Sequence, residues 1–176
     1  MTKMKKAIFL LIFFQSLVFA QKGTPLQYLY LMKSFKPEIQ KVGVICDLSR
    51  NRGIVEKLQR PAFSIGVKII VVDVRELKDV SRGFEELVNN SVDFIWIFSE
   101  DDVSTQPVAR EYIFKNALLK KIPVAVSNLE LVKEGALFSL EVSGEEIKVY
   151  VNNKVASALQ LTVPENYKER VQYVAN

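Results

Sequence analysis

Four short apolar runs constrain the fold of this chain more than any other feature of its sequence. They are "VGVICD" (42–47), "VKIIVVDV" (67–74), "DFIWIFS" (93–99) and "IPVAVS" (122–127). Each is rich in Val, Ile or Phe, and its apolar residues are consecutive instead of alternating with polar ones. Such runs are typical of strands that are buried on both faces of a sheet. The runs therefore predict a central sheet that is covered by helices.

The segments around these runs have the periodicity of helices. They span residues 24–35, 51–64, 76–89 and 106–120. In the third segment, Leu77, Val80 and Phe84 fall on one helical face, and Pro107 suits the first turn of the fourth. Pro61 is expected to kink or shorten the second. Helices that alternate with strands predict an α/β fold with three layers, in which a mostly parallel sheet is flanked by helices, as in flavodoxin-like proteins.

The pattern changes near the C-terminus. Residues 136–151, "ALFSLEVSGEEIKVYV", are typical of two strands joined by a turn at Ser143-Gly144. Residues 152–161 predict a short helix capped by one of its first two Asn residues. Residues 162–174 predict another short helix with a Thr-x-Pro start. A C-terminal hairpin and short helices therefore complete the predicted fold.

The first 20 residues have the layout of a secretory signal peptide. Lysines precede an apolar run at residues 7–14, and Val18 and Ala20 predict cleavage after Ala20. A membrane anchor is the alternative, but Gln15 and Ser16 interrupt the run, which is shorter than the roughly 20 residues that span a bilayer. We therefore expect a protein that is periplasmic or otherwise exported.

The mature chain is expected to be one α/β domain, residues 21–176. Cleavage removes three of the 24 basic residues and none of the 20 acidic ones, which lowers the net charge from +4 to +1. A chain so close to neutral lacks the basic excess of a nucleic-acid binder. It has no histidine, which is the commonest general base and metal ligand, and its one cysteine, Cys46, lies in an apolar run. We therefore predict no catalysis, cofactor or metal, and no nucleic-acid partner.

Polar side chains follow three of the four apolar runs. In open α/β sheets, ligands bind beyond the carboxyl ends of the strands, near the point where the strand order reverses. The candidate ligand-binding residues at these ends are Asp47, Ser49, Asn51, Ser99, Asp101, Asp102, Ser127 and Asn128. The same residue types are common in turns and helix caps, which is the alternative interpretation.

The acidic cluster Glu100, Asp101 and Asp102 has three possible roles: a metal or catalytic site, part of a binding crevice, or a helix cap. A receiver-like site would place acids around Mg²⁺ at the ends of the first and third strands. Only Asp47 follows the first strand, however, and no Lys closes the fourth. Acids before a helix N-terminus are each favoured by about 0.3–1 kcal/mol, so a helix cap explains them without chemistry.

A series of short motifs runs in order through residues 30–170. It comprises Pro37, Val42-Gly43-Val44, Gly66, Asp93, Ile122-Pro123-Val124, Gly135-Ala136, Asn152, Asn153, Ala156, Leu159, Thr162 and Pro164. Together these motifs resemble the second lobe of the periplasmic substrate-binding proteins of ABC transporters, of the tryptophan/tyrosine type. The resemblance implies one lobe of the type I periplasmic-binding fold. It also implies that the loops after the first, third and fourth strands contact the ligand.

The chain also departs from this family. The family has two lobes that close over the ligand, whereas this chain passes from the signal peptide almost directly into the second lobe, and "EVSGEEIKV" replaces a long helix. We therefore expect a non-catalytic binding protein that binds a small solute, such as an amino acid, weakly or as a homodimer. The alternative is a periplasmic interaction or sensory module that has lost solute binding and docks a membrane transporter, receptor or sensor protein.

Overall fold

The computed structural model describes residues 21–144 and 146–174, with only the backbone of Gln21 and Lys22. The predicted signal peptide lies outside these residues. The strands are β1 (Gln21–Lys22), β2 (Lys41–Cys46), β3 (Lys68–Asp73), β4 (Phe94–Ile97), β5 (Val124–Val126), β6 (Phe138–Ser143), β7 (Glu146–Asn152) and β8 (Val171–Val174). The α-helices are α1 (Pro25–Phe35), α2 (Leu48–Ser64), α3 (Val80–Asn89), α4 (Pro107–Leu119), α5 (Leu129–Glu134) and α6 (Asn153–Ala158), and the 3-10 helices are η1 (Leu77–Asp79) and η2 (Glu165–Arg170).

The strands form one sheet in the order β3-β2-β4-β5-β6-β7-β8, and β1 pairs with β6. Strands β2 to β6 are parallel, while β7 is antiparallel to β6 and parallel to β8. The chain leaves β2 for β3 on one side and returns to β4 on the other, so the strand order reverses between β2 and β4. The prediction of a mostly parallel sheet between helices is confirmed, as is the hairpin of β6 and β7.

The structure differs from the prediction in the last segment. Residues 162–174 were expected to be a short helix, but the chain forms η2 and then the strand β8. The helix prediction is wrong for residues 171–174, which pair with β7 and cover its edge. The reason is that two Val residues and a Tyr in "VQYV" suit a strand once a partner strand is available. In addition, α2 continues past Pro61 to Ser64, so the proline does not shorten it.

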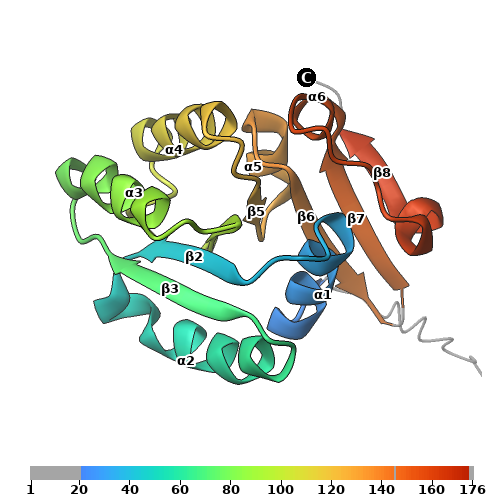
Figure 1. Ribbon diagram of the computed structural model, residues 1–176, viewed down its shortest axis with the longest axis horizontal. Coiled ribbons are helices and arrows are strands. Elements are labelled where there is room, and N and C mark those ends of the chain that lie inside the picture. The colour runs from blue at the N-terminus through green and yellow to red at the C-terminus, as the bar shows by residue number, and fades with distance from the viewer. Residues whose placement is uncertain (1–20, 145, 175–176) are drawn as a thin grey trace, which may run out of the picture.

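Helices cover both faces of the sheet (Figure 1). The sheet separates the buried apolar residues into two clusters, one on each face. One face packs against α1 and α2, and its aromatic residues are Tyr28, Phe35, Phe94, Trp96, Phe98 and Phe138. The other face packs against α3, α4 and α5, and it is mostly aliphatic, with Phe84 and Phe114 as its buried aromatic residues. Below, they are called the α1/α2 face and the α3/α4 face.

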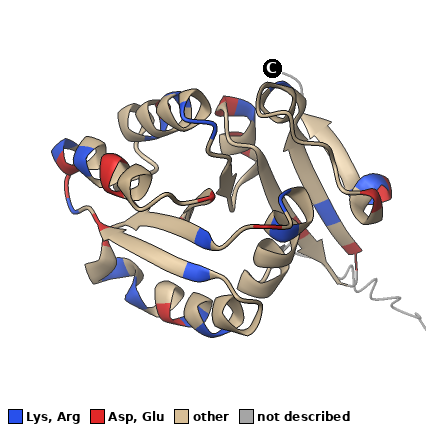
Figure 2. Cartoon of the chain, viewed as in Figure 1, with Lys and Arg blue, Asp and Glu red and all other residues tan. Residues whose placement is uncertain are grey.

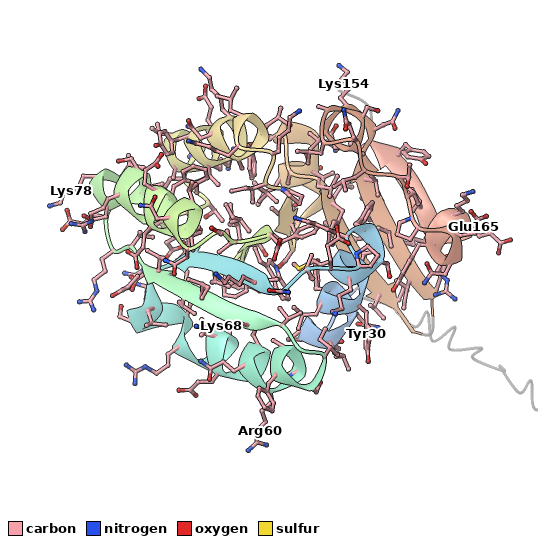
Figure 3. The ribbon with its side chains drawn as sticks, in the orientation of Figure 1. Tyr30, Arg60, Lys68, Lys78, Lys154 and Glu165 are labelled. Carbon is pink, nitrogen blue, oxygen red and sulfur yellow. The ribbon has the colours of Figure 1, made fainter. Side chains whose placement is uncertain are left out.

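Charged residues of both signs are interspersed along the helices α2 and α3 (Figure 2). Long side chains such as Arg60, Lys78 and Glu165 point away from the body of the protein (Figure 3). In the described part of the chain, no helix has both the length and the apolar character that a membrane crossing needs.

Candidate functional site

The carboxyl ends of β2, β4 and β5 lie at one edge of the sheet, because these strands are parallel neighbours. This arrangement brings the candidate residues together. Asp47, Ser49 and Asn51 follow β2, Ser99, Asp101 and Asp102 follow β4, and Ser127 and Asn128 follow β5. The structure tests their position at this edge and not their contact with a ligand, which stays a prediction.

Asp101 lies between the ends of β2 and β4, where the strand order reverses. It is fully buried, and both of its carboxylate oxygens accept hydrogen bonds. Oδ1 accepts from the backbone N–H of Asp47 (2.8 Å) and from Asn51 Nδ2 (2.9 Å). Oδ2 accepts from the backbone N–H (2.6 Å) and the hydroxyl (2.5 Å) of Ser104. Asp101 therefore fastens the loop after β4 to the start of α2.

Asp47 and Asn51 belong to the same buried network. Asp47 is the N-cap of α2 and accepts hydrogen bonds from the backbone N–H and the hydroxyl of Ser49. The hydrogen bond from the Ser49 hydroxyl is the main reason why the pKa of Asp47 is lower than usual. Asn51 Nδ2 also donates to the backbone oxygen of Asp47 (3.0 Å). Asp47, Asn51 and Asp101 thus have structural partners that account for their positions.

The remaining candidates are closer to the surface. Asp102 is exposed and forms an ion pair with Arg50 (2.6 Å). Asn128 caps α5 by accepting from the backbone N–H of Glu130 (2.8 Å). The cap interpretation therefore holds for Asp47 and Asn128. It is wrong for Asp101 and Asp102, because the N-cap of α4 is Gln106.

A cavity of about 200 Å³ lies beside these loops, on the α1/α2 face. It is lined by Gly23, Pro25, Ile54, Lys57, Leu58, Trp96, Phe98, Glu100 and Ser127. Of the eight candidates, Ser127 alone lines it, so the sequence analysis missed most of its wall. One available signal was the alternation in "WIF", which places Trp96 and Phe98 on the same side of β4.

A buried hydroxyl, that of Tyr28, links strands β5 and β6 near the cavity. Strands β5 and β6 pair at Ala125 and Phe138, and beyond this point the Tyr28 hydroxyl lies between them. It accepts from the backbone N–H of Leu140 (3.0 Å) and lies 3.0 Å from the backbone oxygen of Val126. Burial raises the pKa of Tyr28 well above its usual value, so the hydroxyl stays protonated and able to donate. Tyr28 thus bridges two diverging strands beside the cavity.

Aromatic packing holds the cavity wall in place. The Trp96 ring stacks on Tyr28 with 4.6 Å between the ring centroids, and it meets Phe98 edge-on at 5.5 Å. Trp96 is only 4% exposed, and its Nε1 has no hydrogen-bond partner among the described residues. Lys57 and Glu100 are exposed and therefore lie toward the mouth of the cavity. The site combines an apolar interior with charges of both signs at its entrance.

Two features bear on chemistry at this edge. Within residues 21–144 and 146–174, no group of three or more Asp, Glu, Cys or His side chains is arranged so that it could hold a metal ion. Burial raises the pKa of Cys46, at the end of β2, to about 12, so its thiol is protonated at neutral pH and is a poor nucleophile.

The strand order, the two helical layers and the site at the carboxyl edge define a periplasmic-binding-like α/β lobe. The sequence profile of the ABC transporter substrate binding protein family matches residues 26–175. The chain belongs to this family. A search of curated proteins found no match.

Solved structures share this fold at low sequence identity. A conserved domain protein from Vibrio cholerae has a TM-score of 0.74 at 19% identity, with 86% of this chain and 60% of that chain covered. The ligand-free, open structure of a substrate binding protein with adhesive properties from Clostridium difficile has a TM-score of 0.72 at 21% identity, with coverage of 84% and 58%. An ABC domain from Streptococcus pneumoniae in complex with L-Trp has a TM-score of 0.72 at 18% identity, with coverage of 87% and 62%. This chain therefore spans about 60% of the length of these structures.

Proposed function

We propose that this protein binds a small solute, such as an amino acid, without catalysis, in the cavity beside the carboxyl ends of β4 and β5. The observation that carries the proposal is the cavity itself, with its apolar interior and a few polar groups. Pockets for drug-sized ligands usually measure about 300–1,000 Å³. A volume of about 200 Å³ suits a smaller molecule.

The charges at the mouth favour a zwitterion. Lys57 supplies an ammonium group and Glu100 a carboxylate, which complement the carboxylate and the ammonium group of an amino acid. Ile54, Leu58 and Phe98 form an apolar interior for the side chain. One solved structure with this fold, the ABC domain from Streptococcus pneumoniae, is in complex with L-Trp, a ligand of this class.

The affinity is expected to be low if one lobe acts alone. A complete site with micromolar affinity corresponds to about −8 kcal/mol, and half of these contacts would give about −4 kcal/mol, or millimolar affinity. Tight capture would then require a second copy of the chain or another protein. We therefore propose weak binding by the monomer, or binding by a homodimer, with a membrane transporter as the partner that receives the solute. The predicted signal peptide at residues 1–20 supports export to the compartment where such a protein works.

A thermal-shift screen of the mature chain tests the proposal. With a dissociation constant near 1 mM, an amino acid at 20 mM should stabilise the protein by about 1.8 kcal/mol, which raises Tm by about 5 °C for a domain of this size. Ile54→Trp should fill the cavity and abolish the shift. Val108→Trp, at an exposed position on α4, is the matched control and should retain it.

Two results would overturn the proposal: no shift with any of the twenty amino acids, or the same shift in Ile54→Trp as in the wild type. The first result would favour the alternative, an interaction or sensory module that has lost solute binding. Light scattering with and without the stabilising amino acid would show whether two copies pair around it.

A further inference from the structure

The two segments that meet beside the C-terminal end of α4 carry lysines and no acidic residue. Residues 112–129, which include the end of α4, contain three lysines, and residues 147–164, which include α6, contain two. Neither segment contains an Asp or a Glu. The Lys121 ammonium donates to the backbone oxygen of Ala158 (2.7 Å), so the ends of the two helices are neighbours. Positive charge is therefore concentrated here, although the mature chain as a whole is almost neutral.

An apolar side chain is exposed among these charges. Leu119, the last residue of α4, is 72% exposed. Lys115 lies four residues earlier and so on the same side of the helix, and Lys120 follows directly; both are exposed. Lys154, on α6, points away from the body of the protein (Figure 3). The dipole of α4 favours lysines at this end, but it gives no reason for an exposed leucine between them.

We propose that this lysine patch, formed by Lys115, Leu119, Lys120, Lys121 and Lys154, docks the mature chain on a bilayer that contains anionic phospholipids. Charge complementarity identifies the partner, because lysine ammonium groups are attracted to anionic headgroups. An apolar side chain between the lysines can then enter the boundary between headgroups and acyl chains. The predicted signal peptide supports the proposal, because export takes the chain across a membrane whose far surface it then meets.

Docking through the lysine patch would leave the candidate site open. The end of α4 precedes β5, so the patch lies at the amino edge of the sheet. The cavity lies beside the carboxyl ends of β4 and β5, at the opposite edge. The two proposals are therefore independent, since a chain that binds no solute could dock in the same way.

Co-sedimentation of the mature chain with lipid vesicles tests the proposal. The chain should bind vesicles of phosphatidylglycerol and phosphatidylcholine in equal parts, and not vesicles of phosphatidylcholine alone. Each lysine near an anionic surface contributes about fivefold to binding, so the double variant Lys115→Gln with Lys120→Gln should bind roughly 25-fold more weakly. Leu119→Ser should weaken binding about tenfold, because it removes the apolar contact with the bilayer.

Matched control variants lie at the carboxyl edge of the sheet. Lys78→Gln with Arg82→Gln removes the same charge from exposed positions on η1 and α3, and Val108→Ser removes an exposed apolar side chain at the start of α4. Both controls should bind within twofold of the wild type, and thermal melts verify that every variant is folded.

Three results would overturn the proposal. The first is no binding to vesicles that contain phosphatidylglycerol, which would point to an acidic protein as the partner of the lysine patch. The second is unchanged binding of either patch variant. The third is an equal loss in the patch and control variants, which would show that the vesicles attract the chain without a defined docking surface.

Discussion

The two faces of the sheet are packed with different kinds of side chain. The α3/α4 face is mostly aliphatic, and a Cβ added at Gly83 on α3 would lie 2.7 Å from Val74 Cγ1. The α1/α2 face is rich in aromatic residues and contains the cavity beside the carboxyl ends of β4 and β5. The faces therefore differ in the kind of side chain that fills them, and the aromatic face is the one that borders the candidate site.

Truncating one buried leucine on each face compares how much stability the packing of each face supplies. Leu87 on α3 and Leu58 on α2 are both fully buried, but Leu58 lines the cavity. Leu87→Ala should lower the free energy of unfolding by about 3 kcal/mol, and Leu58→Ala by roughly 1 kcal/mol less, because water can enter a space that already exists. Urea denaturation measures both. Equal losses, or a smaller loss for Leu87→Ala, would contradict the difference between the faces.

Asp101 and Asp102 allow a buried and an exposed carboxylate to be compared at the carboxyl edge of the sheet. Asp101→Asn keeps the shape but points an amide N–H₂ toward donors that now meet a carboxylate, and should cost roughly 2 kcal/mol. Asp102→Asn removes an exposed ion pair with Arg50 and should change stability by less than about 0.5 kcal/mol. Thermal melts of the two variants compare adjacent residues of identical type. An Asp101→Asn protein as stable as the wild type would show that the buried hydrogen bonds of Asp101 do not stabilise the fold.

Replacing one glycine on α3 and one on α2 with alanine should change the stability of the protein in opposite directions. Gly83→Ala should destabilise the protein by about 1.5 kcal/mol, because the new methyl group overlaps Val74 on the α3/α4 face. Gly53 on α2 has open space around it, so Gly53→Ala should stabilise by about 0.5–1 kcal/mol through helix propensity. Chemical denaturation distinguishes the signs. A stabilising Gly83→Ala would show that α3 is not packed as closely as described.

The last prediction concerns the amino edge of the sheet, far from the cavity. Burial raises the pKa of Asp93. Hydrogen bonds to its carboxylate from the backbone N–H groups of Gln40 and Lys41 and from the Lys36 ammonium lower the pKa by a larger amount. The net shift of the pKa is therefore downward. Because the pKa is lower in the folded than in the unfolded state, this stabilisation is present above about pH 4 and is lost as the pH falls through the folded value. Asp93→Asn should therefore cost about 1 kcal/mol at pH 7 and progressively less below pH 4.

Unfolding curves of Asp93→Asn and the wild type between pH 2 and pH 7 measure this dependence. A stability difference that stays constant over the whole range would contradict it. Solute binding at neutral pH should be unchanged in this variant, since Asp93 lies at the opposite edge of the sheet.

Much of the fold could be predicted because its strands are unambiguous in the sequence. A buried parallel strand must be apolar at consecutive positions, and β3 to β5 lie within three of the apolar runs, while β2 begins one residue before the first. The strand β8 was missed because its four residues depend on pairing with β7, which periodicity does not reveal. Local propensity favoured a helix behind Thr162 and Pro164, and the tertiary contact decided otherwise.

The position of the candidate site could be predicted, but its detailed structure could not. Parallel strands must end at a common edge, so the loops were certain to meet there. Asp101 and Asp102 are adjacent, but the chain turns here, so that the first is buried and the second is exposed. Tyr28, which stacks on the cavity residue Trp96, contacts Leu140, 112 residues away, and no local pattern encodes that contact.

The fluorescence of Trp96 reports whether a solute occupies the cavity on the α1/α2 face. Trp96 is the single tryptophan and forms part of the cavity wall. Titration of the mature chain with the most stabilising amino acid should change its emission saturably, with the same dissociation constant that the thermal shift gives. Emission that stays constant at concentrations that fully stabilise the protein would place the solute elsewhere and contradict the account.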